Sequence, residues 1–379
     1  MRSGRPSADV AILGGGIVGA ACAAALARDK VTVTLIEAGD GCGCNGATAA
    51  GMGHIVAMDD SEAQFALCCY SSRLWRAIEP DLPRQVEYEA RGTLWIATDD
   101  EEMESVRGKH SFYQTHGVQS DVLDASALRE AEPSLREGLA GALRVPGDSV
   151  IYAPCAAHWL ASTAGVRLVR GEAAAVEPGC VRMMDGSAMP AGLVIIAAGT
   201  ASARLTPGGL PVHPRKGHLA ITDRYPGFLR HQLVELGYLK SAHEHAAESV
   251  AFNVQPRATG QVLIGSSRQY GVEHRAIELP LLARMLERAF VFLPQLAAMA
   301  VIRTWTGFRA ATPDSLPLIG PVAEGVWVAA GHEGLGITTS LGTAQLIADR
   351  LAGRTPAIPA EPYLPSRFFG DFKHDRNHD

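Results

Sequence analysis

No apolar stretch in the sequence is both long and unbroken. The two longest, residues 10–27 and 193–203, are interrupted by Gly or Thr, which is typical of buried strands and helices rather than of membrane spans. Residues 1–9 are polar and lack the apolar segment of a signal peptide. These absences lead us to expect a cytoplasmic protein.

The sequence also has no excess of basic residues over acidic ones. The sequence has 34 Lys and Arg against 40 Asp and Glu, which gives a formal net charge of −6 at pH 7. Proteins that bind nucleic acid usually carry a basic face, so we expect no nucleic-acid partner. The chain has 379 residues, of which 47% are hydrophobic and 20% charged, a balance typical of a globular protein with two or three domains.

The seven cysteines form no disulfide or metal framework. Their number is odd, and neither Cys42 and Cys44 nor Cys68 and Cys69 have C-x-x-C spacing. We expect reduced thiols and no metal site, with Cys42 and Cys44 as small residues of a tight loop near a cofactor. A metal or iron–sulfur centre is the alternative interpretation.

Glycine, by contrast, is abundant, and the first glycine-rich segment has the spacing of a phosphate-binding turn. Gly14, Gly16 and Gly19 follow an apolar run at residues 8–13 and open an Ala-rich helix expected over residues 17–28. In this geometry the first glycine permits a tight turn and the second lets a pyrophosphate approach the backbone. The third glycine lets the helix pack closely on the strand.

The residues around this turn complete a strand–turn–helix–strand unit. Ile17 and Val18 begin the expected helix, where unpaired N–H groups favour an anion. A β-branched run at residues 31–36 ends at Glu37, which is followed by Ala38. An acidic side chain at this place accepts hydrogen bonds from ribose hydroxyls, so the unit predicts a dinucleotide site. A bare turn with a surface glutamate is the alternative.

A second glycine-rich segment lies near the other end of the chain. A buried-strand pattern at residues 326–330 leads into it, and a helix is expected over residues 338–352. A helix N-terminus there would stabilise negative charge on a reduced flavin ring, a contact that a nicotinamide enzyme does not need. The two segments together predict FAD; a structural turn is the alternative. The residues assigned to this second contact are Gly331, His332, Gly334, Leu335, Gly336, Ile337 and Thr338.

The pattern between the two glycine-rich segments is different. Short alternating strands broken by Pro and Gly run from residue 211 to residue 302. The expected fold is α/β: an FAD-binding Rossmann-type domain, glutathione-reductase-like, with an inserted α+β substrate domain on a mixed, mostly antiparallel sheet. The expected FAD-binding domain is discontinuous and comprises residues 1–85, 141–210 and 303–379. The expected substrate-binding domain comprises residues 86–140 and 211–302.

Arg309 lies in a segment of aromatic and small residues, 305–320. A guanidinium is the natural bidentate partner of a carboxylate, and Gly307 and Phe308 beside it are suited to an apolar flavin face. The spacing alone does not separate this role from that of a surface salt bridge.

Taken together, these segments resemble the FAD-dependent D-amino acid oxidase superfamily, which includes glycine oxidase, sarcosine oxidase and the D-amino acid dehydrogenases. The resemblance covers nearly the whole chain. Within the superfamily, residues 41–61 are most similar to D-hydroxyproline dehydrogenases and related opine-oxidising subunits. The matching segments are residues 14–37, 47–52, 197–199, 307–309, 312–320 and 331–332.

The resemblance implies a set of site residues. Arg309 would anchor the substrate carboxylate, and His54 would tune the reaction or accept a proton, with a packing histidine as the alternative. Asn253 stands where the family has a tyrosine, so the site loses a hydroxyl donor. The FAD would be non-covalent, because no cysteine follows Cys180. Thr48, Ala49, Gly51 and Met52 would lie along the pyrophosphate and flavin, and Ala173, Ala198 and Gly199 near the adenine end, with Met52, His54 and Asn253 also facing the substrate.

The implied reaction is oxidation of a D-amino or imino acid to its imine, with hydride transfer to flavin N5. The favoured substrate is cis-4-hydroxy-D-proline, which would give 1-pyrroline-4-hydroxy-2-carboxylate. Opine, sarcosine or glycine oxidation is the first alternative. The second is a flavin subunit that is inactive alone and passes electrons to partner subunits carrying FMN or iron–sulfur clusters, with an acceptor other than oxygen. A catalytically inactive FAD-fold scaffold is the third.

Overall fold

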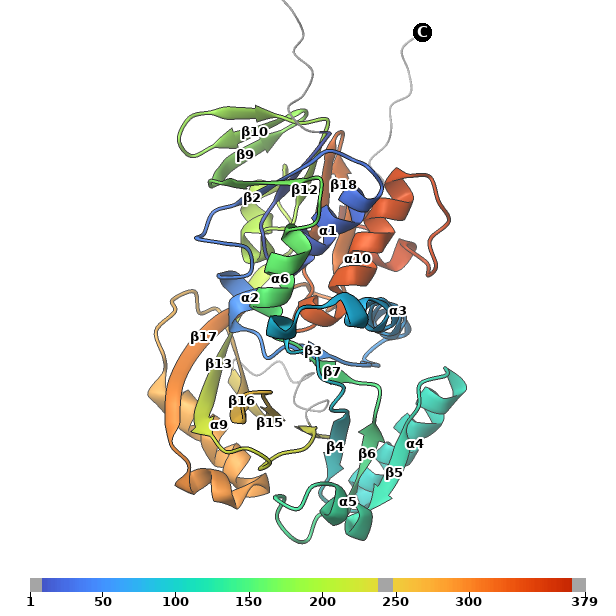
Figure 1. Ribbon diagram of the computed structural model, residues 1–379, viewed down its shortest axis with the longest axis vertical. Coiled ribbons are helices and arrows are strands. Elements are labelled where there is room, and N and C mark those ends of the chain that lie inside the picture. The colour runs from blue at the N-terminus through green and yellow to red at the C-terminus, as the bar shows by residue number, and fades with distance from the viewer. Residues whose placement is uncertain (1–8, 238–247, 370–379) are drawn as a thin grey trace, which may run out of the picture.

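The structure is a computed structural model that describes residues 9–237 and 248–369 (Figure 1). The remaining residues, 1–8, 238–247 and 370–379, include the ends of the expected FAD-binding domain and part of the expected substrate domain, and they lie outside the described residues. The two large sheets lie toward opposite ends of the long axis, with α2, α3 and β3 between them.

A six-stranded sheet forms the half that the sequence predicts to be nucleotide-binding, in the order β18-β19-β12-β1-β2-β8. All neighbouring pairs are parallel except β18 and β19, which are antiparallel. The strands are short and mostly buried, because a parallel sheet is covered on both faces. Their bounds are β1 (Val10–Leu13), β2 (Val33–Glu37), β8 (Val166–Arg170), β12 (Leu193–Ile196), β18 (Leu318–Ala323) and β19 (Val326–Ala330).

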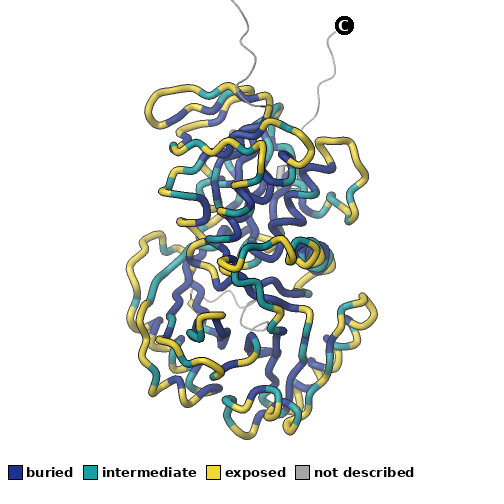
Figure 2. The backbone as a smooth tube through the Cα atoms, viewed as in Figure 1, coloured by how far each residue is buried: buried dark blue, intermediate teal, exposed yellow. Residues whose placement is uncertain are grey.

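Strand alternation gives this sheet two apolar faces. Val10 and Ile12 face a helical layer, whereas Ala11 and Leu13 face a small β-meander. The Ala-rich helix α1 packs against both α6 and α10, and α10 packs against α3, because small side chains allow close approach. The layers consist of α1 (Ile17–Arg28), α3 (Glu62–Ile78), α6 (Ala153–Ala161) and α10 (Gly336–Leu351) on one face, and β9 (Ala173–Glu177), β10 (Cys180–Met183) and β11 (Ala188–Pro190) on the other. Figure 2 shows the buried interior that results.

An eight-stranded sheet forms the other half, in the order β17-β13-β16-β15-β14-β4-β6-β5. Among the described residues of this sheet, only β14 and β4 run parallel, so the sheet is mixed and mostly antiparallel, as the sequence predicted. Its strands are β4 (Thr93–Ala97), β5 (Asp121–Asp124), β6 (Gly141–Val145), β13 (His213–Arg224), β14 (Gln232–Glu235), β15 (Glu248–Pro256), β16 (Gln261–Tyr270) and β17 (Val301–Ala311).

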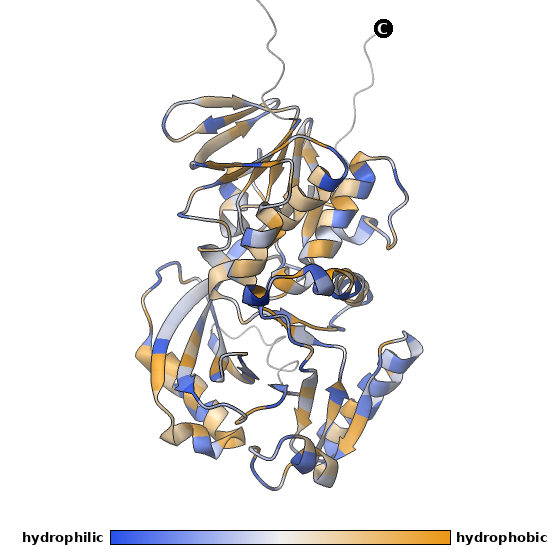
Figure 3. Cartoon of the chain, viewed as in Figure 1, coloured by the Kyte–Doolittle hydropathy of each residue, from blue (hydrophilic) through white to orange (hydrophobic). Residues whose placement is uncertain are grey.

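The amphipathic helix α9 (Leu279–Phe292) covers one face of this sheet. Apolar and polar residues alternate around it in Figure 3, and Phe292 stacks on Phe252 of β15 with ring centroids 4.3 Å apart.

Helices α4 (Asp100–Thr115) and α5 (Ala125–Ala131) pack near the β5–β6 edge. Short elements complete the chain: α7 (Ser202–Leu205), α11 (Ser366–Phe369), η1 (Glu79–Asp81), η2 (Arg84–Val86), η3 (Gly199–Ala201), η4 (Pro294–Ala298) and η5 (Glu361–Tyr363).

The free face of the eight-stranded sheet meets the nucleotide-binding half through two short elements. Helix α2 (Gly46–Ala50) packs on β17, where Trp305 Nε1 donates to the Ala50 carbonyl oxygen at 3.2 Å. Strand β3 (His54–Ile55) pairs with β7 (Ser149–Val150). These two contacts position the substrate side of the cavity described below.

Two strands fall outside the expected division of the chain. Residues 141–145, expected with the nucleotide-binding part, form β6 and pair with β4 and β5 in the eight-stranded sheet. Residues 303–311 belong to β17 of the same sheet. The sequence of neither strand selects one sheet over the other, so their pairing partners decide where they belong.

Candidate active site

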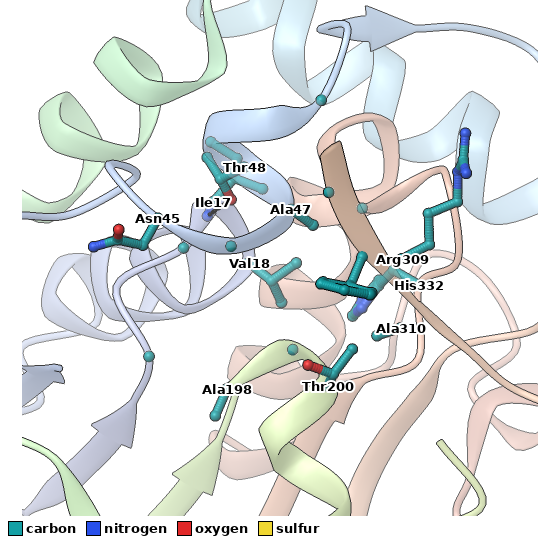
Figure 4. Close-up of a pocket in the computed structure, with 18 of the residues that line it drawn as sticks. Ile17, Val18, Asn45, Ala47, Thr48, Ala198, Thr200, Arg309, Ala310 and His332 are labelled. Atoms are coloured by element: carbon teal, nitrogen blue, oxygen red, sulfur yellow. Dashed lines mark hydrogen bonds between the residues drawn. The ribbon is translucent and has the colours of Figure 1, made fainter. Parts of the chain in front are cut away.

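One long cavity runs from the first glycine turn to the free face of the eight-stranded sheet. At one end it is lined by Glu37, Glu172 and Ala173, and at the other by Asn253 and Arg309. Figure 4 draws residues from both glycine-rich segments around this pocket, with Val18 and Thr48 from the N-terminal part and His332 and Arg309 from the C-terminal part. Segments about 300 residues apart in the sequence therefore share one cavity.

The first glycine turn leaves no room for side chains. Gly14 has φ +105°, and a Cβ there would lie 2.5 Å from the Ala197 carbonyl oxygen. A Cβ on Gly19 would lie 1.9 Å from the Gly14 carbonyl oxygen, so this glycine serves close packing rather than the cavity. Gly16, one residue before α1, lines the cavity directly. The start of α1 is thus open to an anion, as predicted.

The Glu37 carboxylate is fixed at the cavity wall. Its Oε2 accepts from the Gly15 backbone N–H at 2.6 Å and its Oε1 accepts from the Gly39 N–H at 2.7 Å. Each carboxylate oxygen has a second lone pair, so both can still accept a ribose hydroxyl. Thr48 of α2 faces the same region, and its hydroxyl accepts from the Ile17 N–H at 2.9 Å.

The second glycine segment begins α10 at Gly336, two residues before the predicted start. His332 lines the cavity, and its Nε2 lies 3.0 Å from Thr343 Oγ1. Burial lowers the pKa of His332 to about 3, so the ring is neutral at physiological pH. Thr338 Oγ1 donates to the His54 carbonyl oxygen at 2.9 Å and so joins the segment to β3.

Arg309 extends sideways across the eight-stranded sheet. Its Nη1 donates to the Ser267 carbonyl oxygen at 3.0 Å, which means that the side chain crosses the intervening strand β13. The crossing point is Gly217, where a Cβ would lie 2.5 Å from Nη1. On the other side, a Cβ on Gly334 would lie 3.5 Å from Arg309 Nε. Because Gly217 and Gly334 have no side chains, there is room for the Arg309 guanidinium to lie along the sheet.

An apolar wall stands beside Arg309. Met52 packs with Leu219 and Leu263 of the sheet, and a Cβ on Gly265 would lie 2.9 Å from Met52 Sδ. The Gln255 Nε2 donates to the Met52 carbonyl oxygen and fixes the backbone there. A ligand beside Met52 would be shielded from water on that side.

His54 is held in one tautomer. Gln232 Nε2 donates to the Ser149 carbonyl oxygen at 3.3 Å, which turns Gln232 Oε1 toward His54 Nδ1, with which it forms a short hydrogen bond. Nδ1 therefore carries the proton and Nε2 has the lone pair. Burial lowers the pKa of His54, and the polar contacts with Gln232 and Asn253 offset only part of this effect.

Three buried polar atoms in this region, His54 Nε2, Asn253 Oδ1 and Ser266 Oγ, form no hydrogen bond of regular geometry within the described chain, although the Asn253 side chain lies close enough to His54 to favour its charged ring. All three residues line the cavity. A buried polar group without a partner costs free energy, so their concentration at one place points to a polar ligand that supplies the partners.

Most of the predicted site residues line the cavity. They are Gly14, Gly16, Ile17, Val18, Glu37, Ala38, Thr48, Gly51, Met52, His54, Ala173, Ala198, Gly199, Asn253, Arg309, Gly331, His332, Gly334, Gly336 and Ile337. Gly19, Ala49, Leu335 and Thr338 are not among the lining residues. Gly19 packs on the turn, and Leu335 packs with an apolar cluster that includes Phe65 and Trp95.

Several lining residues were not predicted from the sequence. Glu333, the one charged residue of the second glycine segment, could have been identified there. Asn45 precedes α2 and lines the cavity, as does Thr200 after β12. Ser266 carries no sequence signal, because it reaches the cavity only through strand pairing.

Across residues 9–237 and 248–369, no helix combines the length and apolar character needed to span a membrane. The same residues contain no group of three or more His, Cys, Asp or Glu side chains placed to hold a metal ion. All seven cysteines are free thiols in the structure.

The residues fit FAD. The glycine turn has the geometry to accept a pyrophosphate, Glu37 has lone pairs left for a ribose, and a second helix start lies at the far end of the cavity beside a guanidinium. One cavity with both kinds of contact defines an FAD-dependent oxidoreductase.

The comparison with known families agrees. The model of the DAO family, described as FAD dependent oxidoreductase, matches residues 9–350, and the chain belongs to this family. It is 29% identical to glycine oxidase of Geobacillus kaustophilus, over 96% of this chain and 97% of that protein. It is 27% identical to hydrogen cyanide synthase subunit HcnC of Pseudomonas aeruginosa, over 95% of this chain and 96% of that protein.

Solved structures show the same fold. The crystal structure of glycine oxidase from Geobacillus kaustophilus superposes with a TM-score of 0.85 at 27% identity, covering 96% of this chain and 99% of that one. The L-proline dehydrogenase from P. horikoshii superposes with a TM-score of 0.83 at 22% identity, covering 96% and 98%. The predicted fold class and FAD as cofactor are thereby confirmed.

Proposed function

We propose that the protein oxidises a D-amino or imino acid to its imine, with Arg309 binding the substrate carboxylate. The observation that carries this proposal is the placement of Arg309, whose guanidinium lies flat on the sheet in the same cavity as the FAD-binding turns. A guanidinium in this setting binds a carboxylate with two parallel hydrogen bonds.

The cofactor would be held at both ends of the cavity. Glu37 and the start of α1 would bind the adenosine and pyrophosphate, and the 331–337 segment would contact the flavin. When bound, FAD supplies the two-electron acceptor for the Cα hydrogen and its electron pair. The chain's own residues bind, orient and deprotonate the substrate.

Three side chains would prepare the substrate. Arg309 fixes the carboxylate, and Met52 with its apolar neighbours excludes water. Oxidation to an imine needs the nitrogen lone pair, so the ammonium group must lose its proton first. His54 Nε2, which has a lone pair and no partner within the described chain, would accept that proton.

We infer cis-4-hydroxy-D-proline as the substrate, with 1-pyrroline-4-hydroxy-2-carboxylate as the product. Two observations support it: the similarity of residues 41–61 to D-hydroxyproline dehydrogenases, and the unpartnered polar atoms of Asn253 and Ser266, which suit a substrate with a further hydroxyl. Glycine, sarcosine and opines remain rival substrates, because each presents a carboxylate to Arg309. The relative named glycine oxidase favours the first of them.

A second candidate is a flavin subunit that passes electrons to partner subunits carrying FMN or iron–sulfur clusters. The similarity to a protein named as a subunit, HcnC, along 95% of this chain favours it. Such a subunit would be reduced by substrate but would react slowly with oxygen.

We further propose that the six-stranded half binds FAD and the eight-stranded half binds the substrate. Relative to the division expected from the sequence, β6 and β17 would move to the substrate-binding part, because both pair within its sheet.

Anaerobic mixing of the FAD-loaded protein with single amino acids tests these proposals. The panel is cis-4-hydroxy-D-proline, D-proline, L-proline, sarcosine, glycine and an opine, and the readout is bleaching of the flavin absorbance. Bleaching by cis-4-hydroxy-D-proline at the lowest concentration would support the proposed substrate. Bleaching by none of them would reject amino acid oxidation, and slow reoxidation by air would favour the subunit role.

A further inference from the structure

Two arginines stand directly opposite each other on neighbouring strands. Arg215 of β13 and Arg309 of β17 are register partners in the antiparallel pair. Residues in such positions have Cβ atoms about 5 Å apart on the same face of the sheet, and like charges there destabilise the pairing. The arrangement therefore requires a compensating negative charge.

Glu333 supplies that charge. Its carboxylate forms an ion pair with Arg215 Nη2, and the two side chains are 7% and 10% exposed. Arg215 is held from its other side by Tyr270, to whose hydroxyl Nη1 donates at 2.9 Å. The pair is thus buried and fixed in place.

The backbone brings the same glutamate next to Arg309. The Glu333 N–H donates to the carbonyl oxygen of Ala310, the neighbour of Arg309, at 3.0 Å. Gly334, the following residue, packs along the Arg309 side chain. Glu333 adopts φ +52°, which is unfavourable for a residue with a side chain, so the position carries a cost that its carboxylate contact offsets.

The Glu333 carboxylate lies close to two arginines, Arg215 and Arg309, and the ion pair directs it to Arg215. Without Arg215, Glu333 would lose this partner and could turn toward Arg309. The Glu333 carboxylate would then compete with a substrate carboxylate for Arg309.

We propose that Arg215 is a positioning residue that keeps the Glu333 carboxylate away from Arg309 and so preserves the carboxylate-binding charge of Arg309. Arg215 and Glu333 act through Arg309 and need not touch the substrate. The inference rests on the proposed function of Arg309 and adds two residues to that site.

A series of charge-neutralising variants, measured with an unreactive ligand, tests this proposal. The probe is pyrrole-2-carboxylate, a flat carboxylate without an oxidisable amine, and its Kd is measured by calorimetry on the FAD-loaded protein. Arg215→Met is expected to raise the Kd about tenfold or more. Glu333→Gln is expected to leave the Kd unchanged or lower. The double variant Arg215→Met/Glu333→Gln is expected to return within about threefold of the unmodified protein.

Two controls separate this role from a general loss of structure. Uncharged pyrrole-2-carboxamide should bind all four proteins equally. Arg182→Met, which breaks an exposed ion pair between Arg182 of β10 and Glu177 of β9, should change neither Kd. Glu333→Gln and the double variant leave no buried unpaired carboxylate, so they remain informative if Arg215→Met folds poorly.

The proposal fails if Arg215→Met binds the carboxylate like the unmodified protein, or if the double variant binds no better than Arg215→Met. It also fails if Glu333→Gln alone weakens carboxylate binding as much as Arg215→Met does. If Arg309→Met binds pyrrole-2-carboxylate normally, Arg309 is not the carboxylate-binding residue. This result rejects the proposed function of Arg309 and is distinct from the results that reject the role of Arg215.

Discussion

Gly217 lies directly beneath the Arg309 guanidinium. A Cβ at position 217 would lie 2.5 Å from Arg309 Nη1 and 2.9 Å from the Ser267 carbonyl oxygen to which Nη1 donates. The absent side chain on β13 therefore allows an arginine from the edge strand β17 to reach across to β16. The position of the proposed substrate anchor, Arg309, thus depends on a residue that has no side chain.

Gly217→Ala should displace the guanidinium without forbidding the backbone conformation, since Gly217 is not among the glycines with positive φ. We expect kcat/KM for the substrate to fall by about tenfold to 100-fold, because small displacements of an orienting group have large effects. Steady-state kinetics with thermal unfolding checks this. Gly108→Ala on α4 is the matched control, because no atom lies within 4 Å of its added Cβ. Equal kinetics of the two variants would contradict the prediction.

Arg309→Met should raise KM strongly while FAD stays bound. The loss of a charge-assisted contact typically costs about 2–4 kcal/mol, equivalent to roughly 30-fold to 1000-fold in kcat/KM. Steady-state kinetics and the flavin absorbance measure the two effects separately. Arg303→Met serves as a control from the exposed end of the same strand, where Arg303 stacks on Trp305. Unchanged KM in Arg309→Met would refute the carboxylate role.

The hydrogen bond between Gln232 and His54 should set the acid limb of the pH profile. His54 must be neutral to accept a proton, so kcat/KM should fall as pH decreases through its pKa, which burial lowers from 6.5. Gln232→Glu places a carboxylate beside Nδ1 and stabilises the charged ring, so this limb should move to higher pH.

The measurement is kcat/KM between pH 5 and 9 for both proteins. Gln232→Leu should leave the limb at or below its original position, because it removes an acceptor that favours the charged ring. If Gln232→Glu remains active and the acid limb of its kcat/KM profile does not move, the protonation of His54 does not determine that limb.

His332 should make the folded protein sensitive to acid. Its pKa is about 3 in the folded state against 6.5 as a model value, so the unfolded chain binds more protons between these limits. The free energy of unfolding should therefore be fully maintained above pH 6.5 and fall toward pH 3, with a slope from this group of up to about 1.4 kcal/mol per pH unit. His332→Asn should show a shallower decrease in urea unfolding across this range. Parallel curves would contradict the prediction.

Glu37→Gln should weaken FAD binding. The amide has one acceptor oxygen in place of two, so it cannot accept from both the Gly15 and Gly39 N–H groups and a ribose. We expect the Kd for FAD to rise by about tenfold or more, as hydrogen bonds to a charged group are worth about 1.5–3 kcal/mol. Titration of the apoprotein with FAD measures it, with the exposed Glu177→Gln as control. A Kd within twofold of the original would exclude a ribose contact.

The nucleotide-binding part of the site could be predicted because its residues are close in sequence. Gly14, Gly19 and Glu37 belong to one continuous unit, in which each residue's role follows from its distance along the chain. The second glycine segment was predicted for the same reason, since β19 leads directly into α10. In both glycine-rich units, the structure is determined by residues that are close together in the sequence.

The substrate side could be predicted only in part. Arg309 stood out by its residue type and neighbours, but the tautomer of His54 depends on Gln232 and Ser149, which reach it only through the pairing of β3 with β7 and of β14 with β4. The Arg215–Glu333 pair likewise follows from the register of β13 and β17. Contacts between distant segments leave no periodic pattern in either segment.

The placement of β19 and α10 has a consequence for biosynthesis. The central strand β1 is flanked by β12, and β12 completes its pairing only with β19, about 300 residues further along the sequence than β1. The cavity is therefore incomplete until the segment around residue 337 has been synthesised. We expect a polypeptide that ends before residue 337 to fail to bind FAD and to purify colourless.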